Sequence, residues 1–386
     1  MRVLHVGKYY PPIPGGVEYF LADLLSALHR NDIATAALVH KGKGRDASEG
    51  ARGDALPTIY YAPTLGRLLY APVSPSFLYW LNRAIREFQP DLLHLHLPNT
   101  SAFAVLISPA AKRIPWILHW HADVADSRLD WRVGLAYRFY RPLEQRLLGR
   151  GKAVITTSPT YLAASRTLAP WRERCAVIPL GLDRKRLGPP SAALRDQACG
   201  RWGRSSLRVL AIGRLTYYKG HDVLINAVAE LPSARLLIVG QGEHRGRLQA
   251  LIEALRLEAR AELRGFLPDD ELMALLATCD VLCLPSLERT EAFGLVLLEA
   301  MRFAKPVVVS DIPGSGTGWV VAQARNGLLT RPGDPKSVAA ALRQLQESPE
   351  TRLALGERGR AALTSCFDIH PVADQIAALY ARVLGR

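Results

Sequence analysis

The sequence lacks any apolar run that approaches the ~20 residues of a membrane-spanning helix. It also lacks the leader pattern of a signal peptide, because a strand-like stretch, Val3 to Val6, follows the first residues directly. Low-complexity tracts and short-period repeats are missing as well. These absences argue against an integral membrane protein and a secreted one, and we expect a cytoplasmic globular protein.

Cysteine is scarce, and its five residues are odd in number and scattered, at Cys175, Cys199, Cys279, Cys283 and Cys366. This pattern is neither a disulfide framework nor a zinc-binding spacing. Cys279 and Cys283 flank a short apolar stretch that is typical of a strand, where buried thiols are common. We therefore expect neither disulfides nor a structural zinc site.

Acidic residues are fewer than basic ones, and the net charge is +14. Residues 1–185 contain 24 Lys and Arg against 14 Asp and Glu, whereas the remaining residues contain 25 against 21. A basic first half indicates an anionic partner, which is a nucleic acid, a phospholipid surface or a phosphorylated substrate. Simple solubility accounts for the charge equally well. No recognisable nucleic-acid-binding module is present, so we rank nucleic acid last.

With 386 residues, of which 49% are hydrophobic and 22% charged, the chain fits two globular domains. The first half predicts strands at 2–6, 33–39, 56–61, 91–95, 115–120, 152–157 and 175–179, with helices ending near 30 and at 76–88, 100–112 and 132–148. A polar stretch, 184–206, breaks this pattern, and we interpret it as the crossing between domains. The second half predicts strands at 207–212, 235–239, 260–264, 281–284 and 306–309, alternating with helices, and three helices after a Gly-rich loop at 313–318.

This alternation predicts two parallel sheets, each covered by helices on both faces, with a cleft between two similar domains. Ligands of such sheets bind at the carboxyl ends of the strands. The fold class is therefore α/β with two Rossmann-like domains. The predicted boundaries are 1–185 and 186–369.

One stretch after the predicted strand 281–284 draws attention. A Pro-Ser turn and a short polar loop with Glu291 lead to a helix that is apolar on nearly every side and carries Glu299. A carboxylate among apolar residues is costly unless it meets a cation or hydrogen-bond donors. The N–H groups at Gly294 and Leu295 also make this helix start an anion site. The stretch thus holds an acid/base pair or contacts to a ligand with hydroxyls and phosphates. A plain surface loop with an internal ion pair is the simpler alternative.

Two cations, Arg214 and Lys219, lie in one loop directly after the strand 207–212. Arginine grips phosphate oxygens with two donors and lysine adds a mobile point charge, which suits a diphosphate. Interdomain ion pairing is the alternative. The loop before the first helix carries Gly15 and Gly16, which let backbone N–H groups approach an anion.

Histidines alternate at two predicted strand ends, as His94 with His96 and His119 with His121. Each pair shares a strand face. The ligand spacing of a zinc site is missing, so we favour hydrogen bonding between a polar substrate and His121 and Asp123 over metal binding. For His94 and His96, core and functional roles remain equally open.

The stretch 128–152 carries seven cations interleaved with Trp131, Tyr137, Phe139 and Tyr140. A basic, aromatic helix is the composition of an interfacial membrane contact. A solvated helix whose aromatic side chains face the core is the alternative.

Together these residues resemble the retaining family-4 glycosyltransferases of the GT-B fold, over essentially the whole chain. The resemblance rests on Gly15-Gly16, His121-Ala122-Asp123, Ser158-Pro159, Ile178-Pro179-Leu180-Gly181, Gly213-Arg214, Lys219-Gly220, Gly240-Gln241-Gly242, and Glu291-Ala292-Phe293-Gly294 with Glu299. The two glutamates eight residues apart are its most specific part. The resemblance also implies that the last helix, from about 370 to 386, packs back on the first domain.

The resemblance implies a nucleotide-sugar site in the second half. Arg214 and Lys219 would neutralise the leaving diphosphate, Glu291 would hold the transferred sugar, Glu299 the ribose, and His121 would contact the donor sugar. The remaining donor contacts would come from Gly15, Gly16, Gly213, Gly240, Gly265, Phe266, Phe293, Gly294, Leu295 and Val296. On the acceptor side we expect Asp123 and Tyr10. The family needs neither a metal nor a cofactor.

The sequence thus predicts a retaining, metal-independent hexosyltransferase. Tyr217 to Gly220 and Glu291 to Gly294 are similar to mannosyl- and rhamnosyl-type members, which favours a GDP-mannose-like donor. The expected acceptor is a lipid-linked saccharide of cell-surface polysaccharide or lipopolysaccharide synthesis, reached at the cytoplasmic face of the inner membrane. A soluble acceptor, or a non-catalytic protein that binds anionic surfaces, are the alternatives.

Overall fold

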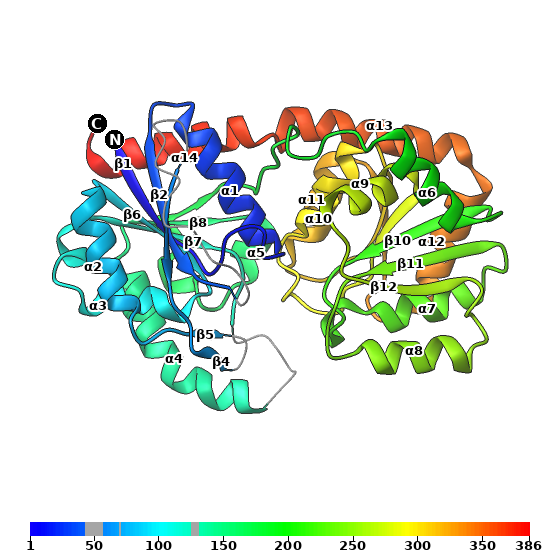
Figure 1. Ribbon diagram of the computed structural model, residues 1–386, viewed down its shortest axis with the longest axis horizontal. Coiled ribbons are helices and arrows are strands. Elements are labelled where there is room, and N and C mark those ends of the chain that lie inside the picture. Colours follow the sequence, from blue (N-terminus) through cyan, green and yellow to red (C-terminus); the bar gives the residue numbers. More distant parts are fainter. Residues whose placement is uncertain (43–56, 69–70, 125–130) are drawn as a thin grey trace. The chain divides into compact units, whose positions relative to one another are not determined.

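The computed structural model describes residues 1–42, 57–68, 71–124 and 131–386. Within them the chain forms two compact units, of which unit 1 combines Met1–Gly181 with Ile369–Arg386 and unit 2 is Leu182–Asp368. Figure 1 shows helices on both faces of a parallel sheet in each unit. The predicted α/β architecture is therefore confirmed.

Unit 1 is built on a seven-stranded sheet in the order β3-β2-β1-β6-β7-β8-β9, and every neighbouring pair is parallel. Its strands are β1 (Arg2–Val6), β2 (Ala34–His40), β3 (Thr58–Ala62), β6 (Leu92–Leu97), β7 (Trp116–Trp120), β8 (Ala153–Thr156) and β9 (Cys175–Val177). A separate antiparallel hairpin joins β4 (Gly66–Leu68) to β5 (Ala71–Val73). The helices are α1 (Gly16–His29), α2 (Phe77–Phe88), α3 (Ala104–Ile107), α4 (Trp131–Arg150), α5 (Pro159–Ala164) and α14 (Ile369–Leu384).

Unit 2 is built on a six-stranded parallel sheet in the order β12-β11-β10-β13-β14-β15. Its strands are β10 (Leu207–Ile212), β11 (Ala234–Val239), β12 (Ala261–Gly265), β13 (Val281–Leu284), β14 (Val307–Ser310) and β15 (Gly327–Thr330). The helices are α6 (Ala192–Trp202), α7 (His221–Ala229), α8 (Arg245–Ala254), α9 (Asp269–Thr278), α10 (Leu295–Arg302), α11 (Gly316–Ala324), α12 (Pro335–Glu347) and α13 (Pro349–Cys366). Short 3-10 turns η1 (Thr100–Phe103), η2 (Ala111–Arg113), η3 (Ala169–Arg174) and η4 (Tyr217–Lys219) complete the two units.

Three predicted segments differ from the structure. The helix expected over 100–112 is broken into η1, α3 and η2, because Ser108 precedes Pro109 and takes an extended conformation that ends α3. The segment 184–206 contains α6, whose N-cap Ser191 accepts a hydrogen bond from the Leu194 N–H at 3.3 Å. The part after β14 contains β15 and four helices rather than three, since the Gly-rich loop runs directly into α11.

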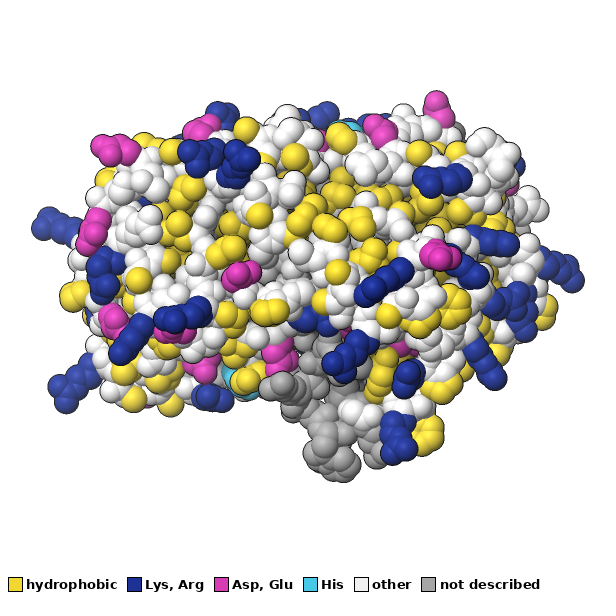
Figure 2. Space-filling model, turned by 180° about the vertical axis from the view of Figure 1, so that it is seen from behind, with side chains coloured by type: hydrophobic (Ala, Val, Ile, Leu, Met, Phe, Trp, Pro, Cys, Tyr) yellow, Lys and Arg dark blue, Asp and Glu magenta, His cyan; other side chains and the backbone are white. Residues whose placement is uncertain are grey.

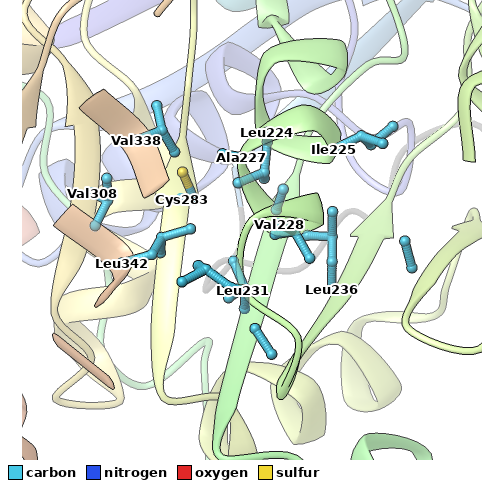
Figure 3. Close-up of a cluster of buried hydrophobic side chains, with 14 of the residues drawn as sticks. Leu224, Ile225, Ala227, Val228, Leu231, Leu236, Cys283, Val308, Val338 and Leu342 are labelled. Carbon is cyan, nitrogen blue, oxygen red and sulfur yellow. The ribbon is translucent and has the colours of Figure 1, made fainter. Parts of the chain in front are cut away.

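The core of unit 2 lies where α7 and α12 pack on the sheet (Figure 3). Leu224 and Val228 of α7 meet Val338 and Leu342 of α12 over Cys283 and neighbouring strand residues, as the close-up shows. Each fully buried side chain of this size stabilises the fold by about 1.5–3 kcal/mol relative to an exposed one. The sheet is thereby a rigid base for the loops at its edge.

The C-terminal helix α14 belongs to unit 1, where Figure 1 shows it beside α1. The Asn31 side chain, which follows α1, donates to the Asp374 carboxylate at 2.7 Å, and the Tyr380 hydroxyl is hydrogen-bonded to His94 of β6. The buried side chains of α14 include Val372, Ile376 and Tyr380. Residues far apart in sequence therefore complete one core.

The surface is rich in cations, and Figure 2 shows Lys and Arg side chains spread over the visible face with fewer Asp and Glu between them. All five cysteines are free, with Cys279 and Cys283 buried, as expected. Among the described helices, none combines the length and the apolar composition needed to cross a membrane.

Candidate active site

The carboxyl edge of the unit 2 sheet gathers most of the residues that the sequence singles out. Strands β10 and β13 are neighbours, so the loop with Lys219 and the loop with Glu291 lie side by side. The Leu287 N–H donates to the Tyr218 carbonyl at 2.7 Å and joins the two loops. This edge is where ligands bind in open parallel sheets.

Lys219 and Glu291 form an ion pair in which each side chain is only about a tenth exposed, at 12% and 11%. Burial by itself lowers the pKa of the Lys219 ammonium, but the Glu291 carboxylate and the Tyr218 hydroxyl outweigh it and raise that pKa above its usual value. The Ser286 hydroxyl also donates to Glu291 Oε2, at 3.3 Å. Lys219 therefore remains charged at neutral pH. Among the described residues, Glu291 is the hydrogen-bond partner of its ammonium, which leaves two of its three donors for a ligand.

Backbone contacts connect the loops that follow β10, β11 and β12. The Gly213 N–H donates to the Val239 carbonyl at 2.9 Å, and the Gly240 N–H donates to the Gly265 carbonyl at 2.8 Å. A side chain on Gly240 would overlap the Gly213 carbonyl, so only glycine permits this approach. Phe266 follows Gly265 and is exposed at the same edge. The three predicted glycines thus lie together, beside Lys219.

Arg214 is exposed on the loop after β10. Partial burial raises the pKa of the nearby Glu243 carboxyl, but a hydrogen bond from its own N–H, one from Thr216 and the positive charge of Arg214 lower it overall. Arg214 therefore lies near the Gly240-Gln241-Gly242 turn. It adds a second cation to the edge that holds Lys219.

Helix α10 starts at this edge, directly after Gly294, which has a left-handed backbone with φ 77°. The N-cap residue Gly294 has no side chain to cap the helix, so the N–H groups of Leu295 and Val296 in the first turn receive no side-chain cap from that position. Phe293 is buried against Phe367, at 6.2 Å between ring centroids. Glu299 lies half-buried one turn further along. The positive end of the helix thus lies close to the Lys219–Glu291 pair.

In unit 1, Gly15 caps α1 and Gly16 is its first residue, exposed at the carboxyl side of β1. Tyr10 packs instead on Leu21, Leu25, Ala37 and Val39, and burial raises the pKa of its hydroxyl to about 12, with Tyr61 and Asp23 adding to the effect. Its expected contact with an acceptor remains a prediction.

His121 and Asp123 follow β7 at the same edge, and both are buried. Asp123 Oδ1 accepts hydrogen bonds from Trp120 Nε1 and from the Ser165 hydroxyl, both at 2.8 Å. The carboxylate therefore shapes the loop around His121. Its role toward the acceptor, like that of His121 toward the donor, stays a prediction.

His121 belongs to a buried histidine cluster on one face of the unit 1 sheet, which consists of His5, His94, His96, His119 and His121. His96 contacts His5 at 3.1 Å and His121 at 3.0 Å through its two ring nitrogens. Burial lowers the pKa of all five, to about 3 for His5 and His121. The cluster is therefore neutral at physiological pH. His94 and His96 therefore lie in the core, which is one of the two roles that the sequence leaves open for them.

The histidine cluster also bears on metal binding. Two groups of three side chains, which share His96, have candidate ligand nitrogens within 4.8 Å of one another. Both ring nitrogens of His96 already face another imidazole, so a metal ion would have to displace these hydrogen bonds. The expectation of a metal-independent protein stays a prediction, tested below.

Two known protein families match most of the chain, one in each half. Residues 15–181 match the glycosyl transferase 4-like domain, and residues 202–362 match the glycosyl transferases group 1. The chain belongs to the glycosyltransferases. The two matches fall on the two sheets described above, with the cation–glutamate edge inside the second.

Relatives of this glycosyltransferase align over nearly its full length. The O-antigen chain mannosyltransferase C of Escherichia coli is 27% identical over 100% of this chain and 99% of its own. The D-rhamnosyltransferase WbpZ of Pseudomonas aeruginosa is 28% identical over 95% of this chain and 92% of its own. The sucrose-phosphate synthase of Thermosynechococcus elongatus, with 22% identity, covers 100% and 99% of the two chains at a TM-score of 0.81. This likeness confirms the predicted GT-B fold.

Other residues, which the sequence did not single out, hold the Glu291 loop in place. The hydroxyl of the buried Ser315 donates a hydrogen bond to the Glu291 carbonyl. The Gly316 N–H donates to the Ala292 carbonyl at 2.9 Å. These bonds and the Ser286 contact hold the Glu291 loop from two sides. Ser315 precedes α11 as its cap, and that capping position was the available signal.

The predicted membrane segment 128–152 coincides with α4 in its described part. Residues 125–130, with Arg128, and the side chains of Trp131 and Arg132 lie outside the described residues. Phe139 is 76% exposed, whereas Tyr137 and Tyr140 are half-buried and stack at 5.9 Å. The exposed Phe139 fits an interfacial membrane contact, whereas the half-buried Tyr137 and Tyr140 fit a solvated helix whose aromatic side chains face the core.

Proposed function

We propose that this glycosyltransferase moves a hexosyl group from a nucleotide-sugar, with a GDP-mannose-like donor favoured, to a lipid-linked saccharide of cell-surface polysaccharide or lipopolysaccharide synthesis. The transfer retains the anomeric configuration and needs no metal. One observation carries the proposal: the buried Lys219–Glu291 pair lies beside Gly294, where α10 begins.

The arrangement suits a nucleoside diphosphate-sugar. Lys219, Arg214 and the first N–H groups of α10 supply positive charge where a diphosphate leaves. Lys219 and Ser286 both donate to Oε2 of the Glu291 carboxylate. In this proposal the other oxygen, Oε1, accepts from a sugar hydroxyl. Glu299 accepts from the ribose hydroxyls in this proposal. The cations then stabilise the diphosphate as its charge develops, and the departing phosphate takes the acceptor's proton on the same face of the sugar.

The names of the relatives support the acceptor and sugar classes. The Escherichia coli relative is named for mannosyl transfer in the O-antigen chain and the Pseudomonas aeruginosa relative for D-rhamnosyl transfer. The charge of +14 and the exposed Phe139 among the arginines of α4 support an approach to an anionic lipid surface. We therefore favour a lipid-linked acceptor and peripheral contact with the cytoplasmic membrane face over a soluble acceptor.

Thermal stabilisation by a panel of nucleotide-sugars tests the donor. A ligand at 100 times its Kd stabilises the folded protein by about 2.7 kcal/mol, which is a clear shift in melting temperature. We expect GDP-mannose to give the largest shift. A panel without any stabilising nucleotide-sugar would contradict the donor site, and a larger shift with UDP- or ADP-sugars would replace the proposed base.

Product analysis tests the stereochemistry, because the anomeric configuration of the product is read directly by NMR. We expect the same configuration as in the donor.

Sedimentation with anionic vesicles tests the surface contact, with neutral vesicles as the control. Equal sedimentation with both, or none with either, argues for a soluble acceptor.

A further inference from the structure

Unit 1 contains a large pocket that the donor chemistry does not use. It has a volume of about 800 Å³ and is lined by the β5–α2 turn, by η1 and α3, and by α4, with Lys8 and Val124 at the carboxyl side of β1 and β7. This volume is that of a small-molecule binding site. Its place at the carboxyl edge of the sheet is where a ligand of this unit is expected.

The lining is mostly aliphatic and aromatic. Val73, Ile107 and Leu143 line the pocket while 37%, 63% and 37% exposed, so large apolar side chains face its interior rather than the core. Phe103 and Tyr140 lie edge to face at 4.9 Å and form part of the wall. An apolar wall of this kind gains free energy when a hydrocarbon covers it.

The polar side chains of the lining are largely engaged inside the protein. Asn99 donates to the Gly7 carbonyl at 3.0 Å, the Ser74 hydroxyl donates to the Pro63 carbonyl at 2.6 Å, and Tyr137 donates to Glu144 at 2.8 Å. The Ser101 hydroxyl contacts His40 at 2.9 Å. A saccharide bound here would lose hydrogen bonds to water that these groups do not replace, whereas a hydrocarbon loses none.

Positive charge accompanies this apolar wall. Lys8 is one of the lining residues, and Arg141 is exposed on α4, directly after the lining residue Tyr140 in the chain. A ligand that matches both features has a hydrocarbon chain and an anionic head. A phosphate fits this description, since lysine and arginine are its usual partners.

We infer that this pocket holds the hydrocarbon chain of a lipid phosphate, and that this chain is the lipid part of the acceptor. That the bound lipid is part of the acceptor rests on the proposed function, whereas the binding of a lipid phosphate in the pocket does not. The pocket thereby selects acceptors by their lipid as well as by their sugar. It also draws the acceptor's phosphate toward Lys8 and Arg141.

Binding of dodecyl phosphate below its critical micelle concentration, measured by calorimetry, tests the inference on the full chain. Two matched variants place a charge on an exposed apolar residue: Ile107→Asp in the pocket wall and Leu353→Asp on α13 of unit 2, which is 71% exposed. We expect Ile107→Asp to weaken binding by about tenfold or more, because a carboxylate would lie against the chain, and Leu353→Asp to leave it unchanged.

Comparison ligands separate the two halves of the claim. Dodecyl maltoside has the chain without the anion, and glucose 1-phosphate has the anion without the chain; we expect both to bind more weakly than dodecyl phosphate. Glucose 1-phosphate binding as tightly as dodecyl phosphate would make the pocket a saccharide site and overturn the inference. Equal binding of dodecyl phosphate to the parent and to Ile107→Asp would overturn it too, as would no binding at all.

The nucleotide-sugar panel, run on the same three proteins, keeps this inference apart from the proposed function. Ile107→Asp is expected to retain the parent's stabilisation by the donor, because Ile107 lies in unit 1 and the donor residues Lys219 and Glu291 lie in unit 2. Loss of donor stabilisation in the parent with intact dodecyl phosphate binding would refute the donor proposal alone. Intact donor stabilisation without dodecyl phosphate binding would refute the pocket alone.

Discussion

At the scale of single residues, the buried Lys219–Glu291 ion pair contributes to stability and is central to the proposed chemistry. Each charge is mostly buried, and each compensates the desolvation of the other. The raised pKa of Lys219 keeps its ammonium charged across the physiological range. The pair thus holds two loops together before any donor binds.

Removing one member of this pair is expected to be costly. Lys219→Met leaves Glu291 buried without its cation and should destabilise the protein by about 3–5 kcal/mol in urea unfolding. Turnover should fall roughly 100- to 1000-fold, because a donor to the leaving diphosphate is lost. The double variant Lys219→Met with Glu291→Gln should regain much of the stability but not the turnover. Recovery of both would show that the pair is only structural.

The histidine cluster makes stability depend on pH. Burial lowers the pKa of its five imidazoles from 6.5, to about 3 for His5 and His121, so these imidazoles stay neutral in the folded protein at pH values where they bind protons in the unfolded chain. Stability is therefore fully present above pH 6.5 and is lost as the pH falls from 6.5 toward 3. One pH unit below 6.5, each histidine costs about 1.4 kcal/mol.

Urea unfolding between pH 8 and pH 5 measures this loss. Buried His40 and His221, with pKa values lowered to about 4 and 3, add to it. Glu144 acts in the opposite direction, because burial raises the pKa of its carboxyl to about 7 and the folded protein binds that proton first. With seven histidines against one glutamate, we expect a net loss. A free energy of unfolding that is flat from pH 7 to pH 5 would contradict the arrangement.

The same cluster provides the test of metal independence. Dialysis against EDTA followed by elemental analysis should leave turnover unchanged and find no stoichiometric metal. Activity that is lost on chelation and restored by zinc would show that the two three-histidine groups hold an ion, as their spacing of at most 4.8 Å permits.

At the scale of elements, the turn between η4 and α7 places Lys219. Gly220 has φ 63°, and a side chain there would overlap the Pro285 carbonyl of the facing loop. The turn therefore needs glycine both for its backbone conformation and for the close approach to the Glu291 loop.

A matched pair of variants separates these two requirements. Gly203 also has a positive φ, 58°, with ψ −154°, and no atom lies within 4 Å of a side chain added there, so Gly203→Ala should cost only the conformational strain of about 1–3 kcal/mol. Gly220→Ala should cost clearly more and should also weaken stabilisation by the donor. Equal losses in melting temperature with unchanged donor binding would show that the approach to Pro285 is not critical.

At the scale of the whole molecule, the last helix is part of the first unit. Helix α14 supplies Val372, Ile376 and Tyr380 to the unit 1 core, while unit 2 ends at Asp368. The last segment of unit 1 therefore follows the whole of unit 2 in the sequence.

Truncation after Asp368 tests this dependence. We expect unit 1 to become sensitive to limited proteolysis, because several fully buried side chains and the Tyr380–His94 hydrogen bond are lost. Unit 2 should keep its own cooperative transition and its stabilisation by the nucleotide-sugar. A truncated chain as resistant as the full one would show that α14 adds little to unit 1.

The sequence by itself determined the α/β class, the order of most strands and helices, and the family. Periodicity and glycine loops are local signals, and Glu291 and Glu299 with Arg214 and Lys219 carry the family pattern in the chain itself. Local signals were less reliable where a single residue overrides the pattern, as at Pro109 within the expected helix 100–112 and at Ser191 before α6.

Only the tertiary structure decided which residues meet. It paired Lys219 with Glu291 and brought Ser286 and Ser315 to the same loop. It also joined five histidines from β1, β6, β7 and the residue after β7, and formed the apolar pocket of unit 1. These contacts join residues tens or hundreds of positions apart. They depend on which strands are neighbours in each sheet and on which face each side chain occupies, and composition and spacing along the chain do not specify either.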